Sequence, residues 1–149
     1  MSVVDASVWV SFFVSTDIHH EVSLDWLERQ FDEQGLLVGP DFLLAEVAGA
    51  IARRSGRARM GVAAIERMLG LPELELFGTD RQLCLNAARL AADLRLRGAD
   101  AICVATAQML GLPLITWDSE LLERAAPAVE VREPRERDCT TRGSRFARR

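Results

Sequence analysis

Short apolar runs alternate with longer amphipathic segments along most of the chain. The runs lie between turn residues, which is typical of buried strands, and they cover residues 3–5, 35–40, 74–77, 112–116 and 128–132. Between them, apolar residues recur every three or four positions, which predicts helices over residues 6–14, 17–31, 41–54, 61–70, 80–97, 98–110 and 118–125. This alternation predicts an α/β fold of three layers, with a mainly parallel central sheet flanked by helices.

Turn and capping residues indicate where several helices begin and end. Pro40 suits a first helical position and Asp41 favours the positive end of a helix, so a helix is expected to begin there. Two glycines in SGRARMG, residues 55–61, predict a break before the next helix. Thr79 or Asp80 is expected to cap the long helix that then runs through Arg97.

The length of 149 residues fits one domain with a substantial buried core. We expect this domain to cover residues 1–131. The remaining residues, 132–149, are polar and rich in Arg, which predicts a disordered C-terminal tail.

Nothing in the chain predicts a membrane span or a secretory leader. The longest apolar region, AICVATAQMLGLPLITW, is interrupted by Gln108, Gly111 and Pro113, so a helix, a turn and a strand are expected there. The first residues lack the basic segment of a secretory signal. Three cysteines without C-x-x-C spacing fit a cytoplasmic protein and predict no disulfide framework or zinc site.

The formal net charge of −4 is distributed unevenly. Residues 132–149 hold seven Arg and three acids, which leaves 11 basic and 19 acidic residues, a net charge of −8, in residues 1–131. Nucleic-acid-binding proteins usually have a basic surface, unlike residues 1–131. If this protein binds a polyanion, the acidic surface must be neutralised where the two meet. All 18 basic residues are Arg, because the chain contains no Lys.

Two aspartates occupy equivalent places, each at the end of a predicted strand and the start of a predicted helix. Asp5 follows Val3 and Val4, and Asp118 follows the strand LPLIT after one residue. At such positions an aspartate serves as a helix cap, because its side chain accepts hydrogen bonds from free backbone N–H groups. It can equally be a ligand, because open parallel sheets bind ligands at the carboxyl ends of their strands.

Two further acids lie on predicted helices. Asp100 opens the apolar helix ADAICVATA, where a buried charge requires compensation that the helix N-terminus supplies only in part. Glu46 lies about 100° from the centre of the apolar face of its helix, at the edge of that face. It can be a solvated residue or a site residue, and Arg53 lies on the same side of the helix as a partner or a phosphate contact.

If these four acids converge, their charges must be held by protons or cations, since two carboxylates ~4 Å apart repel by about 4 kcal/mol. Oxygen ligands favour Mg²⁺ or Mn²⁺ over zinc. An ion held in this way can activate water and neutralise charge on a phosphodiester. Ser7 and Thr116 lie beside the acids, where each either orients a water or ligand or is an ordinary hydroxyl near a helix start.

Four segments in order, VVDASVWV, FLLAEVAGAIARR, LRGADAICVATA and LPLITWDSELLERA, resemble the PIN-domain family. Within that family they are most similar to the VapC toxins of bacterial toxin–antitoxin pairs. The resemblance covers nearly all of residues 1–131 and implies a Mg²⁺- or Mn²⁺-dependent endoribonuclease.

The resemblance assigns a role to each matching acid. Asp5, Asp100 and Asp118 would hold metal, and Glu46 would bind it through water or orient the attacking water. A homodimer, a VapB-like antitoxin that covers the active site and a structured or looped RNA substrate are implied as well. Ser7, Arg53 and Thr116 are candidate substrate contacts.

Other enzyme classes fit the sequence poorly. Receiver domains and haloacid-dehalogenase-type phosphatases rely on a Lys, and nucleotide-binding folds need a Gly-rich turn after the first strand. No G-x-S-x-G supports a serine hydrolase. His19 and His20 would point about 100° apart on a helix, so each is interpreted as a surface or helix-start residue.

Two alternatives concern binding rather than catalysis. Trp9 and Trp117 can stack on an unpaired base, although core packing is the simpler expectation for both. A PIN-like protein that has lost catalysis and binds protein or RNA is the main alternative to an enzyme. Such a protein is expected to lack one or more of the acids, and all four are present here.

Overall fold

Five parallel strands form the centre of the molecule in the order β3-β2-β1-β4-β5. The computed structural model describes residues 1–135, so most of the predicted tail lies outside the described residues. The strands are β1 (Ser2–Val4), β2 (Leu37–Pro40), β3 (Leu74–Phe77), β4 (Leu114–Ile115) and β5 (Val131–Arg132). The expected parallel sheet is confirmed.

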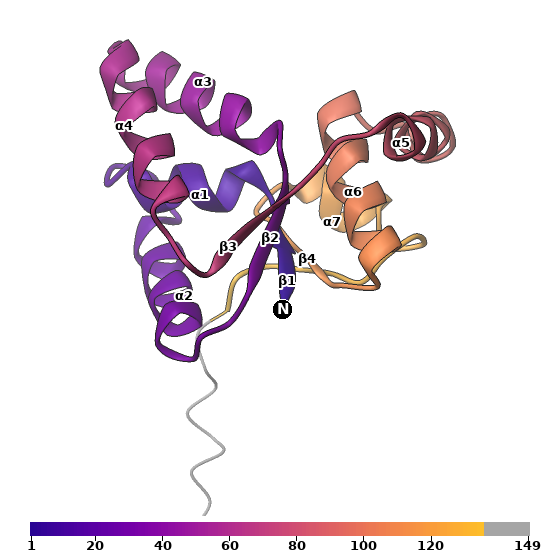
Figure 1. Ribbon diagram of the computed structural model, residues 1–149, viewed down its shortest axis with the longest axis horizontal. Coiled ribbons are helices and arrows are strands. Elements are labelled where there is room, and N and C mark those ends of the chain that lie inside the picture. Colours follow the sequence, from indigo (N-terminus) through magenta and orange to yellow (C-terminus); the bar gives the residue numbers. More distant parts are fainter. Residues whose placement is uncertain (136–149) are drawn as a thin grey trace, which may run out of the picture.

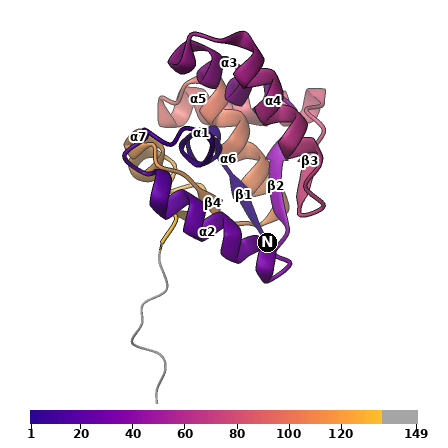
Figure 2. The same cartoon turned by 90° about the vertical axis from the view of Figure 1, so that its left-hand side faces the viewer.

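Helices cover both faces of this sheet (Figure 1). One layer contains α1 (Ala6–Phe13), α2 (His20–Asp32), α3 (Leu43–Ser55) and α4 (Ala58–Leu69), which face the viewer in Figure 2. The other layer contains α5 (Arg81–Leu94), α6 (Gly98–Leu110) and α7 (Ser119–Arg124). The predicted three-layer α/β fold is therefore confirmed. No helix within residues 1–135 has the length and apolar character needed to cross a membrane.

The strands are buried on both faces, which explains why they consist of continuous apolar runs. In β1, Val3 packs with the α5–α7 layer and Val4 packs with the α1–α4 layer, because successive side chains point to opposite faces. Leu114 and Ile115 of β4 repeat this division beside them. Each layer of helices therefore has its own core, and β1 contributes to both.

The predicted break at residues 55–61 is shorter than expected. Gly56, with a φ of 66°, ends α3 in the left-handed conformation, and α4 already begins at Ala58. Gly61 lies inside α4 because the helix passes close to α3: a Cβ there would lie 2.3 Å from the backbone oxygen of Ala48. One of the two glycines thus ends a helix and the other permits close helix packing.

The long helix α5 ends at Leu94, so its predicted extension through Arg97 is wrong. Arg95 adopts the left-handed conformation with a φ of 55°, which turns Leu96 into the core. Arg97 then becomes the extended residue that precedes α6. This connection places Arg97 at the carboxyl end of the sheet instead of on a helix face.

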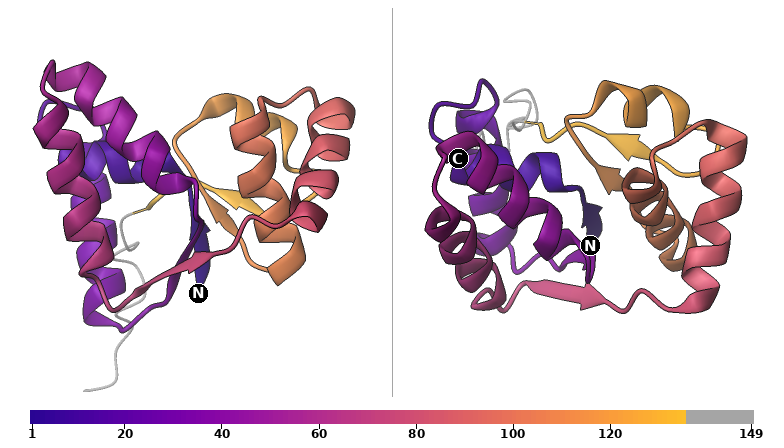
Figure 3. Two further views of the ribbon diagram at one scale, coloured as in Figure 1. Left: turned by 45° about the horizontal axis from the view of Figure 1, so that its top comes forward. Right: turned by 90° about the horizontal axis from the view of Figure 1, so that it is seen from above.

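All five strands point the same way, so the connections that follow β1, β2 and β4 meet at one edge of the sheet. The right-hand view of Figure 3 looks onto the molecule from the side where these connections lie. The first turns of α1, α3 and α7 follow these strands, and the start of α6 lies beside them, because residues at the starts of all four line one cavity. That region contains the acids singled out by the sequence.

Candidate active site

Asp5 ends β1 and is held rigidly at the edge of the sheet. Asp5 is 5% exposed. Within residues 1–135 its carboxylate accepts three hydrogen bonds, all at one oxygen, Oδ2. Ser7 donates its backbone N–H at 3.1 Å and its hydroxyl at 2.6 Å, and the Thr116 hydroxyl donates at 2.9 Å. Asp5 thus caps α1 and still has Oδ1 for a ligand, so the cap and ligand interpretations are compatible.

Ser7 and Thr116 connect β1 to β4 through this carboxylate. The Ser7 hydroxyl also accepts the backbone N–H of Trp117 at 3.0 Å, and the Thr116 hydroxyl accepts that of Asp118 at 3.0 Å. Thr116 is fully buried, so its hydroxyl acts on Asp5 and on the Asp118 backbone. The expected substrate contacts at both hydroxyls stay predictions.

Glu46 lies in the first turn of α3 and reaches Asp5 from the other side of the site. A carboxylate oxygen of each, together with the sulfur of Cys103 on α6, lie within 4.8 Å of one another. Cys103 is buried, and its burial, followed by the charges of Asp5, Glu46 and Asp100, raises the pKa of its thiol well above the usual value. Cys103 is therefore a neutral thiol beneath the carboxylates.

The carboxylates of the site change one another's pKa values. Burial, followed by the charges of Asp5 and Asp100, raises the pKa of Glu46 to about 7, although Arg97 opposes the shift. Burial also raises the pKa of Asp100, against the hydrogen bond and charge of Arg97. Near neutral pH, the positive charge around the site therefore balances only part of the negative charge of its carboxylates. This is the property expected of a cation site.

Arg97 joins the two acids on the far side of the site. Its Nε donates to Asp100 Oδ2 at 2.8 Å, and its Nη2 donates to Asp118 Oδ2 at 2.6 Å. The other oxygen of Asp118 caps α7 by accepting the N–H groups of Glu120 and Leu121. Sequence reasoning missed Arg97 because the residue was placed on a helix, although its spacing three residues before Asp100 is a recognisable pairing distance.

A cavity of about 220 Å³ lies between these groups, and all four predicted acids line it. Arg97, Ser7 and two alanines complete its wall. The donors that reach this cavity are carboxylate oxygens, a set that fits Mg²⁺ or Mn²⁺. Arg53 instead lines a neighbouring cavity, which shares Glu46, Ser7 and Asp118 with the first.

The two histidines and two tryptophans lie largely as expected. His19 precedes α2 and His20 is its first residue, so their helix-start interpretation is confirmed. Trp9 is fully buried in the core. Trp117 packs against the same core on one side, but its ring also stacks on that of His19, a contact that sequence reasoning did not predict.

A comparison with protein-family models matches residues 2–127 to the PIN domain. The chain belongs to the PIN-domain family. No curated relative matches the chain by sequence. The PIN domain accounts for both helix layers and for β1 to β4.

Solved structures with the same PIN fold share little sequence with this chain. VapC20 of Mycobacterium tuberculosis, described as a Sarcin-Ricin loop cleaving toxin, is 22% identical with a TM-score of 0.71 and covers 89% of this chain and 99% of its own. VapBC2 of Rickettsia felis, bound to a DNA fragment from its promoter, is 13% identical with a TM-score of 0.68, covering 89% and 97%. A toxin–antitoxin complex from Klebsiella pneumoniae is 19% identical with a TM-score of 0.64, covering 91% and 99%.

Proposed function

We propose that this PIN-domain protein is a divalent-metal-dependent endoribonuclease that acts as the toxin of a toxin–antitoxin pair. The observation that carries the proposal is the arrangement of Asp5, Glu46, Asp100 and Asp118 around one cavity, with the pKa of Glu46 raised to about 7. Membership of the PIN family and the similarity to a Sarcin-Ricin loop cleaving toxin from Mycobacterium tuberculosis support the same activity.

Asp5, Asp100 and Asp118 are the residues that would hold Mg²⁺ or Mn²⁺. A bound ion supplies a more acidic water and neutralises charge on the phosphodiester. Asp5 presents Oδ1 in a fixed direction, because Ser7 and Thr116 hold Oδ2. This rigidity favours a ligand position that is formed before the substrate arrives.

Glu46 orients the attacking water and accepts its proton. The pKa of Glu46 is about 7 in the metal-free protein, and a cation beside it would lower this pKa, which favours the ionised carboxylate that accepts a proton. The water oxygen forms a bond to phosphorus while one P–O ester bond breaks, and the leaving oxygen takes up a proton. Two products result, one ending in a phosphate and the other in a hydroxyl.

We further propose that a VapB-like antitoxin binds this protein in the cytoplasm and that the protein is a homodimer. The similar structures from Klebsiella pneumoniae and Rickettsia felis are toxin–antitoxin assemblies, which supports an antitoxin partner. Co-purification with the product of a neighbouring gene, followed by measurement of the mass of the complex, tests both statements.

The decisive experiment is cleavage of a pool of structured RNAs by the purified protein, with Mg²⁺, with Mn²⁺ and with EDTA. The Asp100→Asn variant removes a charge from the site with little change in volume. Asp93→Asn, on the exposed side of α5, removes the same charge outside the site and is the matched control. Cuts at a few loop positions that require metal and Asp100 are expected. Folded, antitoxin-free protein that cuts no RNA with either metal would favour the binding-module alternative.

A further inference from the structure

A second cavity, of about 570 Å³, opens directly beside the carboxylates. Glu46, Ser7 and Asp118 line both cavities, so the two cavities adjoin at the carboxylates. The rest of its wall contains two aromatic residues, His19 and Trp117, and the charged residues Asp17, Arg53 and Arg54. Flat rings and cations next to a phosphodiester site are the groups that bind single-stranded nucleic acid.

Trp117 is fixed in place and lies next to a metal-ligand candidate in the chain. Its indole N–H donates to the buried hydroxyl of Ser23 at 2.7 Å, and its backbone N–H donates to Ser7. Because Asp118 is the next residue, the position of this ring relative to the carboxylates is set by the backbone. Trp117 is therefore a rigid base for anything that stacks above it.

His19 lies flat on Trp117, with ring centroids 4.0 Å apart and planes inclined by 9°. Its backbone N–H donates to Asp17 at 2.9 Å, and Asp17 forms an ion pair with Arg54. Since Trp117 packs against the core, His19 is the outer ring of the pair and is half-buried. His19 also lines the cavity, so the outer ring of the stack borders the space in which a third flat ring would lie.

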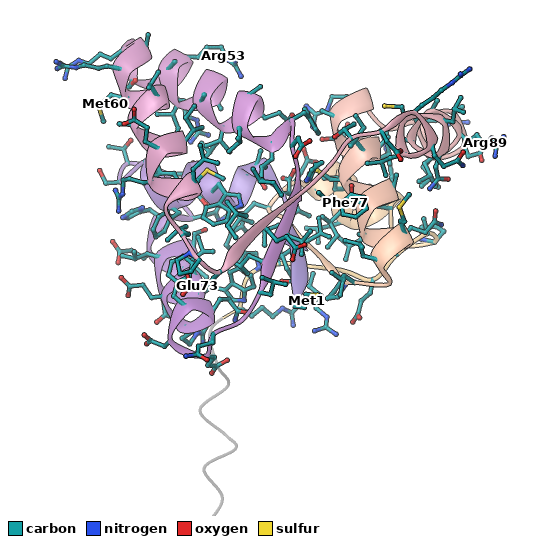
Figure 4. The ribbon with its side chains drawn as sticks, in the orientation of Figure 1. Met1, Arg53, Met60, Glu73, Phe77 and Arg89 are labelled. Carbon is teal, nitrogen blue, oxygen red and sulfur yellow. The ribbon has the colours of Figure 1, made fainter. Side chains whose placement is uncertain are left out.

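Arg53 provides a positive charge on the same wall. It lies seven residues after Glu46 on α3, about 10 Å along the helix axis, and extends from α3 at the top of the molecule in Figure 4. Within residues 1–135 it has no ion-pair partner, whereas its neighbour Arg54 is paired with Asp17. Arg53 is thus free to contact a phosphate.

We propose that this cavity binds one unpaired nucleotide next to the scissile phosphate, with its base stacked on His19 and a flanking phosphate on Arg53. The proposal rests on the proposed function and adds a subsite to it. Stacking accepts any base, so the subsite selects unpaired nucleotides over paired ones and favours purines through their larger rings. In this proposal the strand meets stacked rings and the unpaired charge of Arg53 beside the acids, since Arg54 is already paired with Asp17.

The test measures RNA binding separately from cleavage. Asp100→Asn protein is titrated, without metal, with labelled oligoadenylate and with an oligomer of the same length whose sugars carry no bases. Oligoadenylate is expected to bind about tenfold more tightly than the abasic oligomer. His19→Ala should abolish that difference, whereas His19→Phe, which keeps a flat ring, should retain it.

Arg53→Ala should weaken both oligomers equally and lower the salt dependence of binding by about one counterion. Arg59→Ala removes an exposed charge from α4 outside the cavity and is the matched control. It should change neither the affinity for the two oligomers nor the salt dependence of binding. Folding of each variant is checked by thermal denaturation.

The outcomes separate the subsite from the enzyme. Loss of the preference for bases in His19→Ala alone supports the subsite. An unchanged preference in His19→Ala overturns it, and if the protein without substitutions cleaves the RNA pool the proposed function stands. Absence of binding to both oligomers by folded Asp100→Asn protein overturns the subsite, and cleavage of the RNA pool by the protein without substitutions then decides the function independently.

Discussion

Asp5 and Asp118 have the same local sequence context, yet the structure places them in different surroundings. Each follows a strand and caps a helix. Asp5 is buried and is held by two neutral hydroxyls, whereas the side chain of Asp118 is 24% exposed and is held by the charged Arg97. The Asp5 side of the site is therefore a rigid part of the core, and the Asp118 side is an ion pair that another cation can replace.

The strongest test of this difference is Asp5→Asn. Its carboxylate is the central rigid donor, so we expect RNA cleavage to fall by more than about a thousandfold while the fold persists. The amide keeps the volume and can still accept the hydroxyl hydrogen bonds at its oxygen. Cleavage rates and thermal denaturation of the same preparation check both parts, and cleavage within tenfold of the parent would remove Asp5 from the mechanism.

Thr116→Val should produce a smaller loss that acts through Asp5. The substitution removes one donor to Asp5 and the acceptor for the Asp118 backbone N–H. Because such supporting contacts typically change metal affinity or activity by about 10–100-fold, we expect a loss in that range. The cost in unfolding free energy should be about 1–3 kcal/mol. Thr116→Ser, which keeps the hydroxyl, should restore most of the activity.

Arg97→Ala should have the opposite effect on metal binding. Removing the guanidinium frees Asp100 and Asp118, so Mn²⁺ should bind roughly three- to tenfold more tightly, as measured by calorimetry. Arg89→Ala, on the exposed far side of α5 in Figure 4, removes an equal charge and should leave the affinity unchanged. Weaker Mn²⁺ binding in Arg97→Ala would show that Arg97 organises the site instead of competing for it.

Besides the loss of cleavage expected from removing the proposed general base, Glu46→Gln should have a small effect on the stability of the metal-free protein. Between the ordinary pKa of 4.5 and about 7, the folded protein binds more protons at Glu46 than the unfolded chain does. Ionisation of Glu46 therefore lowers the free energy of unfolding as the pH rises from 4.5 to about 7. Glu46→Gln removes it, so at pH 8 the variant should be more stable by about 1–2 kcal/mol after allowance for solvent screening. At pH 4 the two proteins should differ little, which denaturant unfolding at both pH values will establish.

Most of the fold could be predicted from the sequence because buried parallel strands and amphipathic helices have distinct periodicities. The strand LELF, residues 74–77, was predicted with the limits that β3 has. The end of α5 was missed, because it depends on the left-handed Arg95 and on burial of Leu96, which local propensity does not reveal. As a result, the position of Arg97 beside the acids was not predicted.

Asp5 and Asp118 could be placed together because the carboxyl ends of parallel strands meet at one edge. Glu46 and Asp100, on helices, were linked to them through the resemblance to the PIN family. Two other features depend on contacts between distant segments. Cys103 lies on a helix so apolar that its periodicity gives no sign of which face meets the acids. The stacking of His19 on Trp117 brings together a helix start and a strand end that the sequence does not connect.

Pairing of the first and fourth strands has a consequence for protein synthesis. Thr116 and Asp5, separated by 111 positions in the chain, are joined by a hydrogen bond, and Asp118 follows two residues later. A chain still attached to the ribosome cannot bring Asp5 and Asp118 together until β4 has emerged and inserted beside β1. Such late, long-range contacts also slow folding. The proposed site therefore cannot form on a nascent chain before β4 has left the ribosome and paired with β1.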